Sequence, residues 1–215
     1  MQFSTLFFDL DATLYPASNG LWELIRLRIY KFMREEIGIP EADIPATRDI
    51  YWKTYGTTLE GLRIHHQVKA EEYLNYVHDL PLKDFLTPDP DLYQLLSSLP
   101  QDLWVFTNAD YRHANSVLNE LGIKDLFKGI VDLYAQDFIV KPNPKAYHTA
   151  LKLAGETEPA QCMLFDDLLQ NLVVAKDLGF FTSLVGQNGH SNQIDIHLES
   201  IHEMKEKIPQ LWSRE

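Results

Sequence analysis

The sequence has few cysteines and few basic residues, and it has no long apolar run. Cys162 is the one cysteine among 215 residues, which excludes an intrachain disulfide framework and a thiolate zinc cluster and favours a reducing compartment. No apolar stretch approaches the roughly 18 residues of a membrane-spanning helix. The first basic residue, Arg26, follows the apolar stretch 6–8, the reverse of the order in a secretory signal peptide. We therefore expect a cytoplasmic protein with no membrane partner.

The shortage of basic residues narrows the choice of partners. Nineteen Lys and Arg stand against 31 Asp and Glu, which gives a formal net charge of −12. Such a chain repels the phosphate backbone of a nucleic-acid polymer on average, so we expect no nucleic-acid partner. A small anion is still acceptable wherever a cation meets it locally. Hydrophobic residues make up 45% of the chain, enough to bury a sizeable core.

Five short apolar runs bounded by turn residues predict buried strands. Segments with helical spacing lie between the later runs: 114–121 ends at Gly122, and 168–178 ends at Gly179. Strands that alternate with helices form βαβ crossovers. The sequence therefore predicts an α/β fold, a Rossmann-like doubly wound parallel sheet with helices on both faces. The predicted strands are 5–8, 103–106, 130–133, 162–165 and 181–185.

About ninety residues separate the first two predicted strands, far more than one crossover helix requires. Apolar residues keep helical spacing in this segment over 21–32 and over 70–78, and no convincing strand run occurs. Breakers at Pro16 and Pro81 mark its edges. The length of 215 residues corresponds to about one and a half typical domains. We therefore predict a core domain, 1–15 and 84–215, interrupted by an inserted α-helical cap domain, 16–83.

Polar side chains follow four of the predicted strands at their carboxyl ends. Ligands of parallel sheets bind outside these ends, so the side chains are expected at one rim. Carboxylates gathered there repel one another, which a hard divalent cation offsets, and ligation by oxygen alone favours magnesium over zinc. The polar residues are Asp9 and Asp11 after the first strand, Thr107 and Asn108 after the second, Lys141 after the third, and Asp166 and Asp167 after the fourth.

This set of side chains is suited to a phosphate dianion. A metal and Lys141 supply positive charge, and Thr107 and Asn108 can bind phosphate oxygens. One carboxylate can attack phosphorus and form an acyl phosphate. A second carboxyl group two residues along the strand points roughly the same way and can protonate the leaving alkoxide. The pattern indicates phosphoryl transfer.

The same motifs resemble those of the haloacid dehalogenase superfamily, over residues 7 to about 185. DxDxT alone occurs by chance in a few per cent of chains of this length, on the order of one in thirty, but four motifs in order after four predicted strands are far more specific. The first motif, DxDxT, matches Asp9, Asp11 and Thr13; the second matches Thr107, the third Lys141, and the fourth, a pair of Asp, matches Asp166 and Asp167.

The resemblance implies a role for each position. Asp9 would be the nucleophile and a magnesium ligand. Asp11 would be the general acid and base, and its backbone carbonyl would also ligate the metal; it separates phosphatases from the dehalogenases, which lack an acid there. Lys141 would bridge the nucleophile and the phosphate. Of the others, Thr107 and Asn108 would hold phosphoryl oxygens, Asp166 would ligate magnesium directly and Asp167 would do so through water.

The cap and its flanks resemble more closely the pyrimidine 5′-nucleotidase subgroup found in fungi, plants and bacteria. The likeness includes 55–62, 78–82 and 107–110 followed by His113. One departure is Leu168, where the subgroup usually has Ser. The resemblance implies a nucleoside 5′-monophosphate as substrate. In the cap, His66 and, more weakly, Arg63 are candidates to contact its base or ribose.

Several of these residues also have a purely structural explanation. Asp166 and Asp167 are candidate N-caps of the helix that follows them, and Asp167 can combine this role with the functional one. Thr107 and Asn108 are candidates to cap the helix after the second predicted strand. His66 is explained equally well as a surface histidine, and His113 either orders the loop of the second motif or faces solvent.

The sequence thus predicts a magnesium-dependent phosphatase that hydrolyses small phosphomonoesters through an aspartyl-phosphate, with a pyrimidine nucleoside 5′-monophosphate as substrate. The alternative is a sugar phosphate or phosphoglycolate phosphatase, or a phosphomutase, of the same superfamily, because the cap decides specificity. A non-catalytic protein that binds phosphate ligands is a third interpretation, which the presence of both Asp9 and Asp11 disfavours. We expect a monomer or a weak dimer.

Overall fold

A computed structural model describes residues 3–186 and 191–213, and contacts within the chain divide it into two compact units. One unit comprises Met1–Asn19 and Leu86–Glu215 and is called the core unit below. The other comprises Gly20–Phe85 and is called the helical unit. Among the described residues, no helix combines the length and the apolar character that a membrane span requires.

The core unit contains a six-stranded sheet in which every pair of neighbouring strands is parallel. The strand order is β3-β2-β1-β4-β5-β6, so the first strand lies in the middle. This arrangement confirms the predicted Rossmann-like α/β fold. The strands are β1 (Thr5–Phe8), β2 (Asp102–Phe106), β3 (Gly129–Val131), β4 (Cys162–Asp166), β5 (Phe181–Val185) and β6 (Ile196–Leu198).

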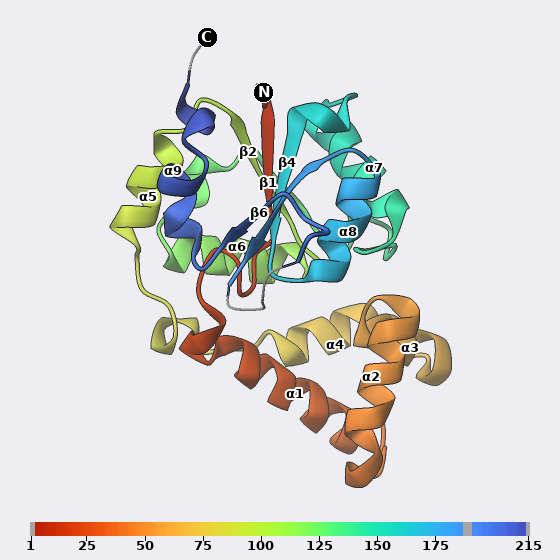
Figure 1. Cartoon of the computed structure of the whole chain (residues 1–215). Helices are drawn as coiled ribbons and strands as arrows, with labels where there is room; N and C mark the ends of the chain where they lie inside the picture. Colours follow the sequence, from red (N-terminus) through yellow and green to blue (C-terminus); the bar gives the residue numbers. More distant parts are fainter. Residues whose placement is uncertain (1–2, 187–190, 214–215) are drawn as a thin grey trace. The chain divides into compact units, whose positions relative to one another are not determined.

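Helices cover both faces of this sheet. In Figure 1 the strands lie between α5 and α9 on one side and α7 and α8 on the other. The helices of the core unit are α5 (Pro90–Ser97), α6 (Tyr111–Glu120), α7 (Pro144–Ala154), α8 (Leu169–Asp177) and the short α9 (Met204–Lys207). Those of the helical unit are α1 (Leu21–Glu35), α2 (Ile44–Tyr55), α3 (Thr58–His66) and α4 (Ala70–Val77).

The central strand is buried on both faces, as expected for a parallel sheet with two helical layers. Successive side chains of β1 point to opposite faces. The ring of Phe7 lies edge-on to Phe106 and Phe180, each with ring centroids 6.2 Å away, whereas Phe8 stacks on Phe165 at 4.7 Å. Burial of each such ring contributes about 1.5–3 kcal/mol to folding. The stacked pair Phe8 and Phe165 are also register partners, so β1 and β4 end side by side.

In the helical unit, α2 and α3 pack closely because a glycine lies at their contact. A Cβ on Gly61 would come within 2.2 Å of Cγ of Tyr51, so no other residue fits there without a shift of the helices. The α3 helix starts at a regular N-cap, in which Thr57 Oγ1 accepts a hydrogen bond from the Glu60 N–H at 3.1 Å. These two features determine the orientation of α3, the helix that carries Arg63 and His66.

Candidate active site

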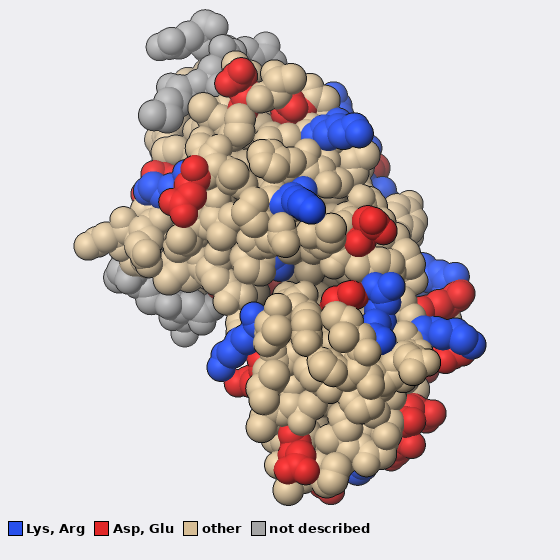
Figure 2. Space-filling view, turned by 90° about the vertical axis from the view of Figure 1, so that its right-hand side faces the viewer, with Lys and Arg blue, Asp and Glu red and all other residues tan. Residues whose placement is uncertain are grey.

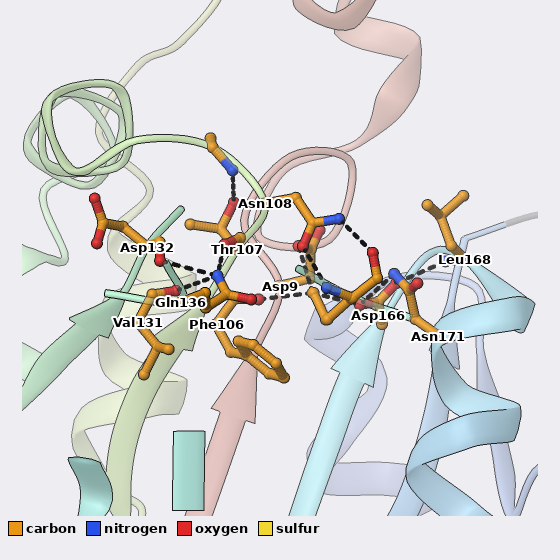
Figure 3. Close-up of polar contacts among 12 residues, drawn as sticks. Asp9, Phe106, Thr107, Asn108, Val131, Asp132, Gln136, Asp166, Leu168 and Asn171 are labelled. Carbon is orange, nitrogen blue, oxygen red and sulfur yellow. Dashed lines mark hydrogen bonds and ion pairs between the residues drawn. The ribbon is translucent and has the colours of Figure 1, made fainter. Parts of the chain in front are cut away.

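The carboxyl ends of three adjacent strands bring the first, second and fourth motifs together (Figure 3). Asp9 follows β1, and its N–H donates to the Phe165 carbonyl of β4 at 2.8 Å. Thr107 follows β2, and its N–H donates to the Val131 carbonyl of β3 at 3.0 Å. Asp166 is the last residue of β4, which extends one residue beyond the predicted strand. The parallel register therefore sets Asp9 next to Asp166.

Lys141, from the segment between β3 and α7, completes this cluster. Its Nζ donates to Asp9 Oδ1 at 2.9 Å, to Asp166 Oδ2 at 2.6 Å and to the Phe106 carbonyl at 2.7 Å. Only 1% of the residue is exposed. Burial alone would lower the pKa of Lys141, but Asp166 and Asp9 outweigh it and raise the pKa above its ordinary value. The side chain is therefore a buried ammonium group that links two carboxylates.

Asp166 is fully buried and accepts hydrogen bonds from two further residues. The Leu168 N–H donates to its Oδ1 at 2.9 Å, and Asn171 Nδ2 reaches both of its oxygens, at 2.9 and 3.1 Å. The bond from residue 168 comes from the backbone, so the replacement of the subgroup's Ser by Leu does not remove it. Asn171, on the first turn of α8, thus helps to fix Asp166 beside Lys141.

Two carboxyl groups of the cluster have strongly raised pKa values. Burial raises the pKa of Asp9 to about 7; Lys141 acts against this and Asp166 adds to it. Burial, together with the negative charge of Asp9 and Asp166, raises the pKa of Asp167 to about 8, although Lys141 lowers it. Among the described residues, Asp9, Asp166 and Asp167 thus lie around the ammonium group of Lys141, which pairs with the first two, so the ionised carboxylates outnumber this cation.

The donor set and its spacing fit a hard divalent cation. One oxygen each from Asp9, Asp166 and Asp167 lies within 4.8 Å of the others. All three donors are carboxylate oxygens, the ligand type that Mg²⁺ prefers. Burial raises the pKa values of Asp9 and Asp167, the negative charge of the neighbouring carboxylates adds to the rise, and a bound cation would relieve that charge.

Asp11 contacts two residues that motif spacing alone does not bring to the site. His113 Nε2 lies 2.8 Å from Asp11 Oδ1, and the Tyr15 hydroxyl donates to the same oxygen at 2.5 Å. His113 is buried, which answers the question that the sequence left open. Burial by itself would lower the pKa of His113, but Asp11, with Asp110, raises it. The sequence does hold a hint of this position. Asp110 is a typical N-cap residue, so His113, three residues later, is expected in the first turn of the helix that starts at the site.

The loop after β2 is held by its own side chains. Thr107 Oγ1 accepts from the Ala109 N–H at 3.0 Å. The side-chain amide of Asn108 bonds the backbone of Lys141 in both directions, with Nδ2 to the carbonyl at 2.8 Å and Oδ1 to the N–H at 3.1 Å. Gln136, which the sequence analysis did not identify, donates from Nε2 to the Thr107 carbonyl at 2.7 Å. Asn108 therefore anchors the segment that carries Lys141.

The structure contradicts the capping explanations for the motif residues. The α6 helix is capped by Asp110, whose Oδ1 accepts from the N–H groups of Arg112 and His113, and not by Thr107 or Asn108. The N-cap of α8 is Leu168, which makes no side-chain capping bond, so neither Asp166 nor Asp167 is the N-cap. The reason is that the N-cap of α6 lies three residues beyond Thr107 and the N-cap of α8 lies one residue beyond Asp167.

The two candidates from the predicted cap lie on α3 of the helical unit. His66 is exposed, and its Nε2 lies 3.0 Å from the Tyr51 hydroxyl. Arg63 Nη1 donates to Glu60 Oε2 at 2.6 Å, one turn earlier on the same helix. Within the helical unit both side chains are thus held by neighbouring groups. Their contact with a substrate stays a prediction.

Comparison with known proteins gives a matching family and curated relatives that cover most of the chain. A family profile described as haloacid dehalogenase-like hydrolase matches residues 3–179. Phosphate metabolism protein 8 of Saccharomyces cerevisiae is 33% identical over 187 residues, which are 80% of this chain and 58% of the yeast protein. The chain therefore spans a little over half of the length of this relative.

Solved structures share the fold. The HAD-type hydrolase YfnB of Bacillus subtilis, determined with bound magnesium, superposes with a TM-score of 0.64 at 16% identity and covers 96% of this chain and 98% of its own. A β-phosphoglucomutase from Clostridium difficile gives a TM-score of 0.63 at 19% identity, with 98% and 97% of the two chains covered. At these identities the likeness shows the fold alone.

Proposed function

The chain belongs to the haloacid dehalogenase-like hydrolases, and from this membership we propose that it is a magnesium-dependent phosphatase that hydrolyses small phosphate monoesters through an aspartyl-phosphate. The observation that carries the proposal is the cluster in which Lys141 links Asp9 to Asp166 next to Asp167. A nucleophilic carboxylate, a buried cation and an excess of negative charge suited to a metal are the parts that phosphoryl transfer requires.

Asp9, Asp166 and Asp167 would hold Mg²⁺, and the resemblance adds the backbone carbonyl of Asp11. Bound there, the cation would neutralise charge on the phosphate and on the transition state. Asp166 already accepts hydrogen bonds from Lys141, Leu168 and Asn171. This occupancy favours Asp167 as the direct ligand, the reverse of the order that the resemblance implies.

In the first half-reaction, an Asp9 carboxylate oxygen attacks phosphorus while the bond between phosphorus and the ester oxygen breaks. Lys141 stabilises the ionised Asp9 that this attack needs. Asp11 gives its proton to the departing oxygen, which leaves as an alcohol. In the second half-reaction, Asp11 takes a proton from the water that attacks the aspartyl-phosphate. Inorganic phosphate leaves, and the Asp9 carboxylate is restored.

The loop after β2 supports binding of the phosphoryl group. Thr107 Oγ1 accepts a hydrogen bond from the Ala109 N–H, so its own hydroxyl hydrogen can be donated to a phosphoryl oxygen. The amide of Asn108 bonds the backbone of Lys141, which favours a role in holding Lys141. The resemblance implies that Asn108 also contacts the phosphate. Its side-chain Nδ2 would then have to donate both to the Lys141 carbonyl and to a phosphoryl oxygen.

The substrate that we propose is a pyrimidine nucleoside 5′-monophosphate, selected by residues 16–83 acting as a cap, with Arg63 and His66 contacting the base or ribose. The support is the likeness of the cap motifs to those of the nucleotidase subgroup. In addition, the imidazole of the exposed His66 is held in one orientation by Tyr51. The second candidate is a sugar phosphate, because the cap decides specificity and the fold, shared with a β-phosphoglucomutase, does not.

Phosphate release from a panel of esters tests both levels of the proposal. We expect Mg²⁺-dependent hydrolysis of p-nitrophenyl phosphate, lost in Asp9→Asn and retained in the matched control Asp102→Asn, whose carboxylate pairs with Lys128 at the far end of β2. UMP and CMP should be the best esters, ahead of phosphoglycolate and glucose phosphates. Unchanged turnover in Asp9→Asn would refute the mechanism. Strong hydrolysis of a sugar phosphate beside negligible hydrolysis of UMP would instead refute the nucleotidase assignment.

A further inference from the structure

The carboxyl group of Asp11 is bound through one of its two oxygens by donors from two distant parts of the core unit. The Tyr15 hydroxyl comes from the loop that follows β1, four residues after Asp11. His113 Nε2 comes from the first turn of α6, 102 residues away in the sequence. Both reach Oδ1. A carboxylate oxygen only accepts hydrogen bonds, so Nε2 carries the hydrogen in this contact.

Each of the two donors is itself fixed. His113 is 3% exposed, and its backbone N–H is held by Asp110 Oδ1 at 3.1 Å in the N-terminal turn of α6. Tyr15 is 4% exposed, and burial together with the Asp11 charge raises the pKa of its hydroxyl, which therefore stays protonated and donates.

Between Asp11 and Thr13, Ala12 has φ +63°, a left-handed conformation uncommon for a residue with a Cβ. The turn that carries Asp11 is thus held in a conformation that local sequence does not favour.

These contacts constrain how Asp11 can transfer a proton. An oxygen that accepts from two donors is a poor site for a third hydrogen, so the transferable proton of Asp11 lies on Oδ2. The contacts also fix the rotation of the carboxyl group, so that Oδ2 has one direction. General acid catalysis requires this kind of placement, because the acid must lie within hydrogen-bond reach of the departing oxygen.

We propose that Tyr15 and His113 are positioning residues that hold Oδ1 of Asp11 and thereby present its Oδ2 to the leaving group. This inference rests on the proposed phosphatase function and deepens it. Neither residue touches the substrate; each acts through Asp11. Tyr15, the second residue after the DxDxT motif, and His113, the third residue after the helix-capping Asp110, would then belong to the acid–base machinery.

Leaving-group dependence separates this role from a merely structural one. The value of kcat/KM reports the steps up to departure of the leaving group. p-Nitrophenolate departs without an acid, whereas the alkoxide of an alkyl phosphate needs a proton from Asp11. We compare kcat/KM for p-nitrophenyl phosphate with that for the best alkyl phosphate of the panel, in the holoenzyme with saturating Mg²⁺.

We expect Tyr15→Phe and His113→Leu each to lower kcat/KM for the alkyl ester about tenfold more than for the aryl ester, a fraction of the ~100- to 10,000-fold that general acids contribute. His113→Gln, which keeps an N–H donor at a similar reach, should recover most of the difference. The matched control Tyr93→Phe removes an exposed hydroxyl that contacts Asp125 and should change neither ester. On an Asp11→Asn background, neither substitution should add to the difference.

The outcomes distinguish this inference from the proposed function. Equal losses on the two esters, or a further selective loss on the Asp11→Asn background, overturn the positioning role while the phosphatase function stands. Failure of the wild-type protein to release phosphate from either ester overturns the function and this inference with it. Should His113→Leu not fold, Tyr15→Phe and His113→Gln decide the question, because they retain the size of the native side chains.

Discussion

At the level of single residues, Lys141 is a charged side chain that is almost fully buried. Its ammonium group lies between the carboxylates of Asp9 and Asp166 and also donates to a backbone carbonyl. A buried charge of this kind is stable only while its partners are present. The ammonium is equally necessary to the carboxylates, since it pairs with both Asp9 and Asp166, which lie beside Asp167.

Replacement of Lys141 by Met should therefore destabilise the protein by about 3–5 kcal/mol, the usual cost of removing one partner from a buried ion pair. The measurement is urea unfolding of the metal-free protein in the presence of a chelator. Lys128→Met serves as the control, because that lysine pairs with Asp102 at the surface and should cost about 1 kcal/mol or less. A loss at Lys141 as small as the control's would mean that the buried pair is not needed for folding.

Motifs predicted the participants of the site but not all of their contacts. The proximity of Asp9, Thr107 and Asp166 could be predicted from the sequence, because each lies at the end of a strand and parallel strands end at one rim. The bonds from Tyr15 and His113 to Asp11 could not, since they depend on how a loop turns at Ala12 and on where α6 begins. The same limit explains Asn108, whose amide bonds the Lys141 backbone 33 residues away.

At the level of secondary structure, the strands of the sheet interior were predictable and several helices were not. Buried parallel strands are continuous apolar runs, which stand out in the sequence. The edge strand β6 was missed because its three residues include His197. The α5 and α7 helices begin at Pro90 and Pro144, directly after the capping residues Asp89 and Asn143. Proline is favoured at the first helical position, a signal that the sequence analysis did not use for these two helices.

At the edge of the sheet, the carboxylate of Asp195 links the segment before β6 to β5 and α8 through hydrogen bonds. Asp195, next to β6, accepts from the N–H and Oγ1 of Thr182 on β5, at 2.9 and 2.8 Å, and from Lys176 Nζ at 2.9 Å. Burial alone would raise the pKa of Asp195, but the bonds from Lys176 and Thr182 outweigh it and lower the pKa. A lowered folded-state pKa means that the ionised form is the one that folding stabilises.

Asp195→Asn should consequently reduce the free energy of unfolding by about 1–2 kcal/mol at pH 7. The stabilisation is complete above the unfolded-state pKa, about 3.9, and is lost as the pH falls through the lower folded-state value. The difference between wild type and variant should narrow as urea unfolding is repeated from pH 7 toward the lowest pH at which both fold. A gap that stays constant with pH would contradict the ion-pair explanation. Asp177→Asn, exposed at the end of α8, supplies the comparison.

At the level of the whole molecule, charged side chains of both signs are spread over the surface, whereas the candidate site is one cluster in the core unit. On the face drawn in Figure 2, Lys and Arg side chains lie interspersed with Asp and Glu. The expectation that a polyanion is not the general partner rests on the net charge of −12. The positive charge offered to a small anion comes instead from buried Lys141 and from the proposed Mg²⁺.

Magnesium should raise the thermal stability of the entire chain, because a ligand that binds only the folded state stabilises it. At 100 times its dissociation constant the gain is about 2.7 kcal/mol, or roughly 5–10 °C in Tm for a chain of this size. Differential scanning fluorimetry with MgCl₂, against NaCl at equal ionic strength, measures it. Asp167→Asn should lose most of the shift, and Asp91→Asn, exposed on α5, should keep it. The absence of any magnesium-specific shift in the wild type would count against the metal site.

The strand order has a consequence for the synthesis of this chain. Of the six strands of this sheet, β1 is made before the others, yet it lies between β2 and β4 in the finished sheet. It ends at Phe8, and β4 begins only at Cys162, more than 150 residues later. At about 5–20 residues per second, a ribosome needs roughly 8–30 s to cover that distance. Throughout this interval one edge of an apolar strand is open to pairing with other chains, so the time of translation is the period in which the protein is most exposed to aggregation.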